Sequence, residues 1–238
     1  MGTILYQIDM SLILLIETAT TVCSVALAEH GSVLAYKEVE QRNIHAEAIT
    51  VFIDELFKIT GKNYHDLDAV AVSCGPGSYT GLRIGVSSAK GLCFALDKPL
   101  IAIETLEAMA EGIAAQSTFD NNNILLCPMI DARRMEVFTA VFDINGNRVK
   151  PTSAEILDEK SFNDLLRTNK MLFFGDGAWK CKEILSANPN VQIITDFTNS
   201  ARYLNKMAAK KYAANNFADT AYFEPYYLKD FIAGKKST

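Results

Sequence analysis

The chain has 238 residues, of which 49% are apolar and 21% charged, with only 6 prolines and 13 glycines. This composition excludes a disordered, collagen-like or low-complexity protein. The 23 basic and 28 acidic residues leave a net charge of −5, whereas a protein that binds nucleic acid by itself more often carries a basic surplus. We therefore expect a globular protein with enough apolar sequence for a sizeable core, and not an autonomous RNA-binding protein.

The cysteines and the N-terminus indicate the compartment. The five cysteines are odd in number and widely spaced, and no two form a C-x-x-C pair. This favours a reducing compartment over a disulfide scaffold or a thiolate metal site. The apolar run from Leu12 ends at Glu17 and has no basic region before it, so it resembles neither a membrane span nor a signal peptide. The sequence predicts a cytoplasmic protein without a membrane partner, which starts at Met1 or Met10.

In the first half, short apolar runs alternate with amphipathic segments and turn residues. Gly31 and Ser32 predict a hairpin turn, Asn43 an N-cap, Gly61 a helix end and Ser78 a second N-cap. The predicted order is strands 12–17, 22–28 and 33–39, helix 43–59, strand 69–74, helix 78–96, strand 100–103 and helix 105–116.

The second half repeats this order of elements. We predict strands 124–130 and 136–142, a third strand after the turn 145–147, helix 161–167, strand 171–174, helix 179–186, strand 191–194 and helix 200–215. Each half therefore has the order βββαβαβα, with an acidic residue after its first strand (Glu17, Asp131). This predicts an α/β protein of two lobes, 1–118 and 119–238, that face a cleft. We expect the last helix to pack back on the N-terminal lobe.

The duplicated unit resembles the ATPase fold shared by actin, the heat-shock chaperone ATPases and the sugar kinases. Within it, the segment GPGSYTGLRIG at 75–85 resembles the signature of the TsaB (YeaZ) family, the accessory subunit of the bacterial machinery that makes threonylcarbamoyladenosine in tRNA. Further segments are similar to that family in the same order along the chain. They are LIETAT at 15–20, DARRMEVF at 131–138 and EPYYLK at 224–229.

This resemblance implies a subunit that catalyses nothing itself, has no cofactor of its own and works with two other proteins. The catalytic paralogue, TsaD, transfers the threonylcarbamoyl group from its adenylate to the adenosine next to the anticodon in tRNAs that read ANN codons. The ATPase TsaE assists, and tRNA is met only through the complex. The resemblance also implies that helices of the first lobe meet TsaD, and that TsaB alone pairs with itself through the same face.

An alternative is an autonomous ATPase or small-molecule kinase of the same fold. Such an enzyme needs an acidic residue near the phosphates and glycine-rich turns whose N–H groups approach them. Here Glu17 stands where an aspartate is expected, the turn 18–21 has no glycine, and the turn 132–135 carries two arginines and a methionine. These features disfavour ATP hydrolysis and predict that Glu17 and Asp131 bond local backbone or Arg133.

A metallopeptidase is a third hypothesis, because the family once carried a peptidase label. The histidines are His30, His45 and His65, with no H-E-x-x-H motif among them, so we predict no metal site. Ser78 follows a Gly-Pro-Gly loop, which superficially resembles a nucleophile elbow, but a helix cap explains its hydroxyl more simply. An anion bound to the amides of residues 77–80 is the less favoured alternative.

Two helices of the first half carry more small or apolar surface than one packing face requires. In the helix 78–96, a stripe of small residues and one leucine suggests close approach of a partner helix, although packing within the fold is the alternative. In the helix 43–59, apolar residues cover an arc of about 180°, wider than the ~100° stripe of a surface helix. The predicted partner-binding residues are His45, Ile49, Phe52, Leu56, Ser78, Gly81, Gly85, Ser88 and Leu92.

Overall fold

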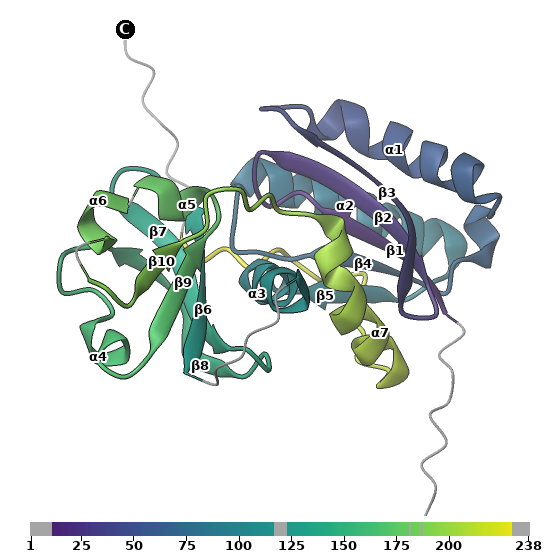
Figure 1. Ribbon diagram of the computed structural model, residues 1–238. Helices are drawn as coiled ribbons and strands as arrows, with labels where there is room; N and C mark the ends of the chain where they lie inside the picture. Colours follow the sequence, from purple (N-terminus) through teal and green to yellow (C-terminus); the bar gives the residue numbers. More distant parts are fainter. Residues whose placement is uncertain (1–10, 117–122, 181, 187, 230–238) are drawn as a thin grey trace, which may run out of the picture.

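The computed structural model describes residues 11–116, 123–180, 182–186 and 188–229. Two lobes, each built on a five-stranded sheet, stand side by side with helix α3 (Thr105–Gln116) between them (Figure 1). Met1, Met10, Cys181 and the predicted boundary at 118/119 lie outside the described residues.

The first sheet has the strand order β3-β2-β1-β4-β5. Its first three strands form an antiparallel meander, and β4 and β5 run parallel to β1. Strand β1 is buried along its whole length, which explains why it is a continuous apolar run rather than an alternating one. The strands are β1 Leu12–Glu17, β2 Val22–Glu29, β3 Ser32–Glu40, β4 Ala69–Ser73 and β5 Leu100–Ile103.

Helices cover both faces of this sheet. Helices α1 (His45–Thr60) and α2 (Tyr79–Leu96) pack on one face. The 3₁₀ helix η2 (Ala201–Leu204) and helix α7 (Asn205–Ala213) pack on the other. Helix α7 thus comes from the second half of the sequence but lies on the first sheet.

The second sheet repeats the first. Its order is β10-β9-β6-β7-β8, which, counted from its own first strand, is the same 3-2-1-4-5 arrangement in reverse. The predicted duplicated fold of the actin and sugar-kinase type is confirmed. The strands are β6 Ile124–Asp131, β7 Glu136–Asp143, β8 Arg148–Ile156, β9 Lys170–Phe174 and β10 Val191–Ile193.

Helix α3 covers one face of the second sheet, where Leu106, Met109 and Ile113 join its core. On the other face lie the short helices α4 (Asn163–Leu166), α5 (Asp176–Lys180) and α6 (Lys182–Leu185). A short 3₁₀ helix, η1 (Tyr64–Asp66), which the sequence analysis did not predict, precedes β4.

Helix boundaries show where the local signals were right. Gly61 ends α1 in the left-handed conformation, with φ +67°, and the Ser78 hydroxyl caps α2 by accepting from Gly81 N at 3.3 Å. Asn43 is not the N-cap of α1. It has φ +63°, and the helix begins after Ile44 without a side-chain cap.

Two predicted helices differ from the structure in their bounds. The prediction 179–186 corresponds to α5 and α6, which stand on either side of Cys181, a residue outside the described part of the chain. Helix α5 begins three residues earlier than predicted, where Gly177 approaches the backbone of Ile130 closely. The prediction 200–215 corresponds to η2 followed by α7, because Ser200 accepts from Arg202 N and begins a 3₁₀ turn. Within the described residues, no helix is both long and apolar enough to span a membrane.

Candidate partner surface and the turns after β1 and β6

The turn between β1 and β2 is satisfied by its own carboxylate. Glu17 Oε1 accepts from Ala19 N at 2.6 Å, and the Thr18 backbone also lies close enough to lower the pKa of Glu17. Thr18 and Ala19 are fully buried. These N–H groups point at Glu17 and not into an open site, so they are not free to receive a phosphate group.

Glu17 itself is completely buried. Burial raises its pKa to about 7, and the contacts from Ala19, Ser73, Asn199 and Thr18 only partly oppose that rise. The second oxygen, Oε2, has no hydrogen-bond partner among the described residues. A carboxyl group in this setting takes up a proton near neutral pH.

Asp131, at the corresponding position of the second lobe, is likewise engaged locally. Its Oδ1 accepts from Arg133 N at 2.8 Å and forms an ion pair with Lys180. Its own N–H donates to Asp176 Oδ1 at 2.9 Å, and burial raises the pKa of Asp176. The prediction that both strand-end carboxylates bond local backbone is confirmed.

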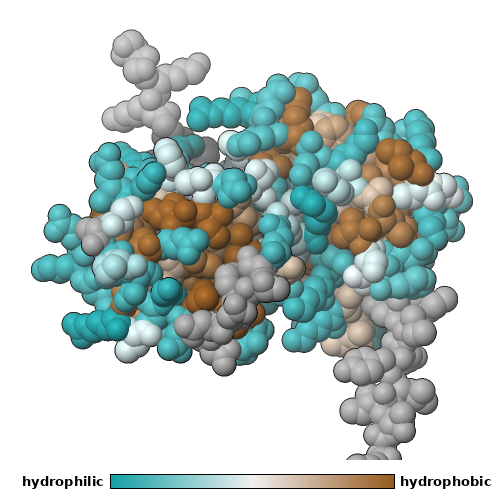
Figure 2. Space-filling view, viewed as in Figure 1, coloured by the Kyte–Doolittle hydropathy of each residue, from teal (hydrophilic) through white to brown (hydrophobic). Residues whose placement is uncertain are grey.

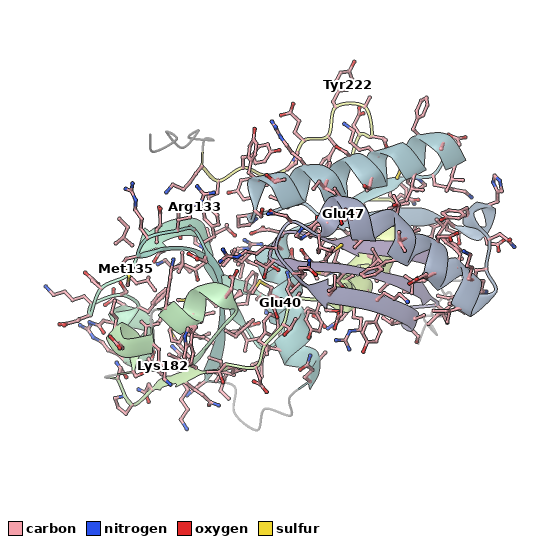
Figure 3. All side chains as sticks on the ribbon, turned by 90° about the horizontal axis from the view of Figure 1, so that it is seen from above. Glu40, Glu47, Arg133, Met135, Lys182 and Tyr222 are labelled. Carbon is pink, nitrogen blue, oxygen red and sulfur yellow. The ribbon has the colours of Figure 1, made fainter. Side chains whose placement is uncertain are left out.

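The hairpin after Asp131 presents side chains where an ATPase of this fold has glycine. Arg133 and Arg134 both adopt positive φ, +70° and +51°. Arg133 lies on the second lobe towards the end of α2, Met135 lies further out on the same lobe, and Glu47 lies on α1 of the first lobe (Figure 3). Glycine at these positions would let a phosphate group come close to the backbone, whereas two arginine side chains block that close contact.

His45 lies inside the first lobe and not at a cluster of metal-binding side chains among the described residues. His45 lies in α1, 6% exposed, with its Nε2 3.2 Å from the Val22 carbonyl. No cluster of three or more His, Cys, Asp or Glu side chains that could hold a metal ion occurs in the described part of the chain.

Three of the predicted partner-binding residues of α1 are buried in the first lobe. His45, Ile49 and Leu56 are 6%, 1% and 0% exposed, and the two apolar residues belong to the core between α1, α2 and the first sheet. The wide apolar arc of α1 therefore packs mostly within the protein, and the prediction is corrected for these three residues. Phe52 packs against the same core but is only half-buried.

The prediction that Gly81 and Gly85 of α2 bind a partner is also corrected. A Cβ on Gly81 would overlap the Thr18 carbonyl, and a Cβ on Gly85 would overlap the Thr18 side chain. Both glycines are buried against the β1–β2 turn of the same lobe. The small-residue stripe thus serves a close intramolecular contact at these positions, which is the alternative that the sequence analysis left open.

The remaining predicted residues keep accessible surface, and three apolar residues join them. Ser78 is exposed, and Phe52, Ser88 and Leu92 are half-buried. Val51, Ile59 and Phe94, which were not predicted as partner-binding residues from the sequence, are 51%, 65% and 87% exposed. We call these seven residues the α1–α2 surface. Figure 2 shows apolar surface on the first lobe over α1.

The sequence does contain a pattern that could have identified Phe94 as an exposed apolar residue. At 100° per residue it shares a helix face with Arg83, Ser87 and Lys90, and a lone phenylalanine among polar residues marks an unusual surface position. Ile59 was within the apolar arc but lies at the last turn of α1, where it is 65% exposed.

Residues 218–229 run along α2 towards the second lobe, which the sequence analysis did not foresee. Lys90 Nζ donates to the Ala221 and Phe223 carbonyls at 3.1 and 3.0 Å. Arg83 Nε donates to the Tyr227 hydroxyl at 3.3 Å, and Lys229 forms an ion pair with Glu136 of β7. Tyr222 projects away from the body of the molecule (Figure 3). The family-like segment EPYYLK therefore ties the lobes together.

A pocket of about 330 Å³ lies on another side, between α3, α7 and the turn after β7. Leu126, Phe142 and Met207 contribute apolar walls. At its rim Lys206 Nζ lies 2.8 Å from Glu111 Oε1, so these opposite charges compensate each other. None of the predicted partner-binding residues lines this pocket.

Comparison with known proteins agrees with this architecture. A family model described as TsaD, tRNA N6-adenosine threonylcarbamoyltransferase, matches residues 33–233. The structure of YeaZ from Pseudomonas aeruginosa superposes with a TM-score of 0.77 at 24% identity, over 92% of this chain and 100% of that one. The strand order of the two sheets thus defines a two-lobed protein with a fold of the actin and sugar-kinase type.

The curated relatives narrow the class to a family. The TsaB protein of Haemophilus influenzae is 30% identical over 236 residues, which cover 94% of this chain and 96% of the relative. That of Escherichia coli is 29% identical over 231 residues, covering 94% and 97%. The chain belongs to the family that the TsaD model describes and, within it, to the TsaB proteins. Both relatives are named tRNA threonylcarbamoyladenosine biosynthesis proteins.

Proposed function

We propose that this chain is a non-catalytic subunit that binds and activates TsaD, together with TsaE, in threonylcarbamoyladenosine synthesis. The modified nucleoside is the adenosine next to the anticodon in tRNAs that read ANN codons. The chain works in the cytoplasm, meets tRNA only within the complex, and forms a homodimer when TsaD is absent.

The observation that carries this proposal is the α1–α2 surface. Val51, Ile59 and Phe94 expose large apolar side chains on two neighbouring helices of one lobe. Exposed large apolar side chains are enriched at protein–protein interfaces. Phe52 and Leu92 add half-buried apolar area to the same helices, and a partner helix laid over them would remove that area from water.

The turns after β1 and β6 support a non-catalytic role. Glu17 and Asp131 each accept a hydrogen bond from the backbone two residues further on, so neither is an uncommitted carboxylate at an open site. The alternative, an ATPase or small-molecule kinase, requires magnesium-dependent ATP hydrolysis by the purified chain, which we expect to be absent.

The test is co-purification and titration with TsaD of the same organism. Phe94→Lys and Ile59→Lys place a charge on exposed positions near the ends of their helices, so folding should be retained. We expect each to weaken TsaD binding by at least tenfold. Trp179→Lys is the matched control, because Trp179 is 61% exposed but lies on α5 of the second lobe. Equal affinity of wild type, Phe94→Lys and Ile59→Lys would contradict the proposed surface.

A further inference from the structure

A row of polar side chains crosses the first sheet in register. Ser24 on β2 pairs with Glu17 on β1 and with Glu38 on β3. Ser73 ends β4, one residue after Val72, the register partner of Ile16, and so stands beside Glu17. Residues in register project from the same face of a sheet. The row Glu38–Ser24–Glu17–Ser73 therefore lies on the face that η2 covers.

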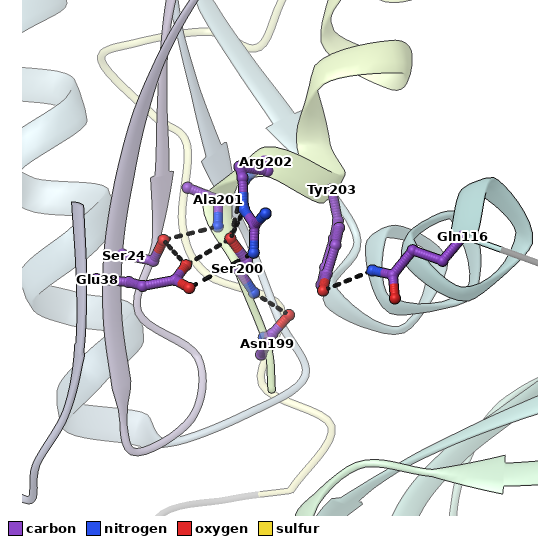
Figure 4. A network of polar contacts seen from close by, with 8 residues as sticks. All are labelled: Ser24, Glu38, Gln116, Asn199, Ser200, Ala201, Arg202 and Tyr203. Atoms are coloured by element: carbon purple, nitrogen blue, oxygen red, sulfur yellow. Dashed lines mark hydrogen bonds and ion pairs between the residues drawn. The ribbon is translucent and has the colours of Figure 1, made fainter. Parts of the chain in front are cut away.

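The Glu38 end of the row is fully bonded (Figure 4). Glu38 Oε2 accepts from the Ser200 hydroxyl at 2.7 Å and from the Ser24 hydroxyl at 3.3 Å. The Arg202 guanidinium lies 3.5 Å from its Oε1. This end holds the segment that returns from the second lobe and needs no further partner.

The Glu17 end is different. Glu17 Oε2, Ser73 Oγ and Asn199 Nδ2 have no hydrogen-bond partner within the described residues, although all three residues are at most 4% exposed. Ser73 and Asn199 lie close enough to Glu17 to influence its titration. Buried polar atoms without a hydrogen-bond partner are unfavourable. A small shift of the Ser73 hydroxyl or the Asn199 amide towards Glu17 Oε2, or a proton on that oxygen, would supply the missing hydrogen bonds.

Glu17 is linked to the start of α2 by a short series of tight contacts. Its Oε1 accepts from Ala19 N at 2.6 Å, and the Ala19 carbonyl accepts from Ser78 N, just before α2, at 2.7 Å. The next residues of α2 have no space to move independently, since Gly81 and Gly85 pack directly on Thr18. The position of the β1–β2 turn therefore sets the position of the N-terminal end of α2.

We propose that Glu17 is a positioning residue for the N-terminal end of α2, and that loss of its proton holds this end more firmly for the partner. The inference rests on the proposed function, because α2 carries part of the α1–α2 surface. A carboxylate accepts stronger hydrogen bonds than the neutral acid. Ionised Glu17 thus binds the Ala19 amide more tightly, and it can also accept from Ser73 and Asn199.

The side chains around Glu17 are uncharged, are buried thiols or are engaged in contacts of their own. Ser73 and Asn199 are uncharged, and burial raises the pKa of the Cys23 and Cys74 thiols to about 11. On the neighbouring strands, Glu38 is held by Ser24, Ser200 and Arg202, and the His45 ring of α1 lies against the Val22 carbonyl.

The test compares wild type with Glu17→Gln, which keeps an oxygen for Ala19 N but cannot ionise. The affinity for TsaD is measured from pH 5.5 to 8.5. We expect wild-type affinity to rise by about fivefold relative to Glu17→Gln over this range, as a charge-assisted hydrogen bond replaces a neutral one. Asp68→Asn is the matched control, because Asp68 Oδ2 accepts from Leu12 N at the opposite end of β1, and it should keep the wild-type profile.

A second readout does not depend on TsaD. The amide nitrogen shifts of Ser78 and Gly81 should follow one titration near pH 7 in wild type and in Asp68→Asn, and none in Glu17→Gln. Identical pH profiles of these amides in wild type and Glu17→Gln would overturn the inference. A wild-type protein whose amides titrate as expected but which does not bind TsaD at any pH would instead refute the proposed function.

Discussion

The side chain of Thr18 occupies the space that a side chain on Gly85 would need. One turn earlier, Gly81 makes the same close approach to the Thr18 carbonyl. Glycine within a helix is less favourable than alanine by roughly 1 kcal/mol, so two glycines in one helix must be offset elsewhere. Here they let α2 lie directly on the β1–β2 turn, which joins the turn and the helix into one rigid unit.

Gly85→Ala and Gly85→Leu should therefore destabilise the protein itself. Overpacking at a tight contact typically lowers stability by about 1–3 kcal/mol, which for a chain of this size lowers the melting temperature by roughly 2–12 °C. Gly91→Ala is the matched control in the same helix. A Cβ there meets nothing within 4 Å, so this change should raise stability by up to about 1 kcal/mol. Melting of Gly85→Ala at the wild-type temperature would be inconsistent with the close contact.

The buried carboxyl of Glu17 should make stability fall as pH rises. Burial raises its pKa from an ordinary value of 4.5 to about 7 in the folded protein, so the folded state holds the proton more tightly. The contribution is complete below pH 4.5, decreases as pH rises, and is lost above about pH 7. A shift of this size corresponds to about 3 kcal/mol.

Urea unfolding of wild type and Glu17→Gln between pH 4.5 and 8 measures this contribution. Other groups titrate equally in both proteins, so the difference between the two curves isolates Glu17. A constant difference across the whole range would mean that Glu17 keeps an ordinary pKa.

The strand-end carboxylates should be dispensable for tRNA modification by the reconstituted system. Asp131→Ala removes a partly exposed ion pair with Lys180, which contributes less than about 1 kcal/mol. With TsaD at saturating concentration, Asp131→Ala and Glu17→Ala should stay within several-fold of the wild-type rate. A loss of several orders of magnitude with unchanged complex formation would reveal a catalytic role.

The isolated chain should be a homodimer in concentrated solution, because Val51, Ile59 and Phe94 expose apolar surface on one lobe. Adding TsaD should convert this homodimer into a heterodimer through the same surface. Light scattering during a titration measures both steps, and Phe94→Lys should impair both. A stable monomer at high concentration would contradict the first step, and a complex that contains TsaD and two copies of this chain would contradict the second.

Much of the fold was readable from short stretches of sequence. Apolar runs such as 12–17 and 124–130 predicted the buried first strands, because a strand covered on both faces has no need to alternate. Ser78 and Gly61 marked helix ends through interactions within a few residues. The repeated order of elements then sufficed for two lobes with the same strand arrangement. Asn43 is not the N-cap of α1, because its backbone is in the left-handed region and the N-cap position falls on the next residue, Ile44.

The site was only partly readable, for a physical reason. A helical wheel shows which residues share a face, but it does not show what lies against that face. Gly81 and Gly85 were recognisable as a close-approach stripe, yet only the tertiary structure showed that Thr18 of the same lobe fills it. In the same way, His45 and Leu56 were apolar-face residues by spacing, and the sheet and α2 bury them. The sequence by itself determined the order of the strands, the helix ends at Gly61 and Ser78, and the family. Tertiary structure decided which apolar surface is left for a partner, because burial depends on neighbours that are distant along the chain.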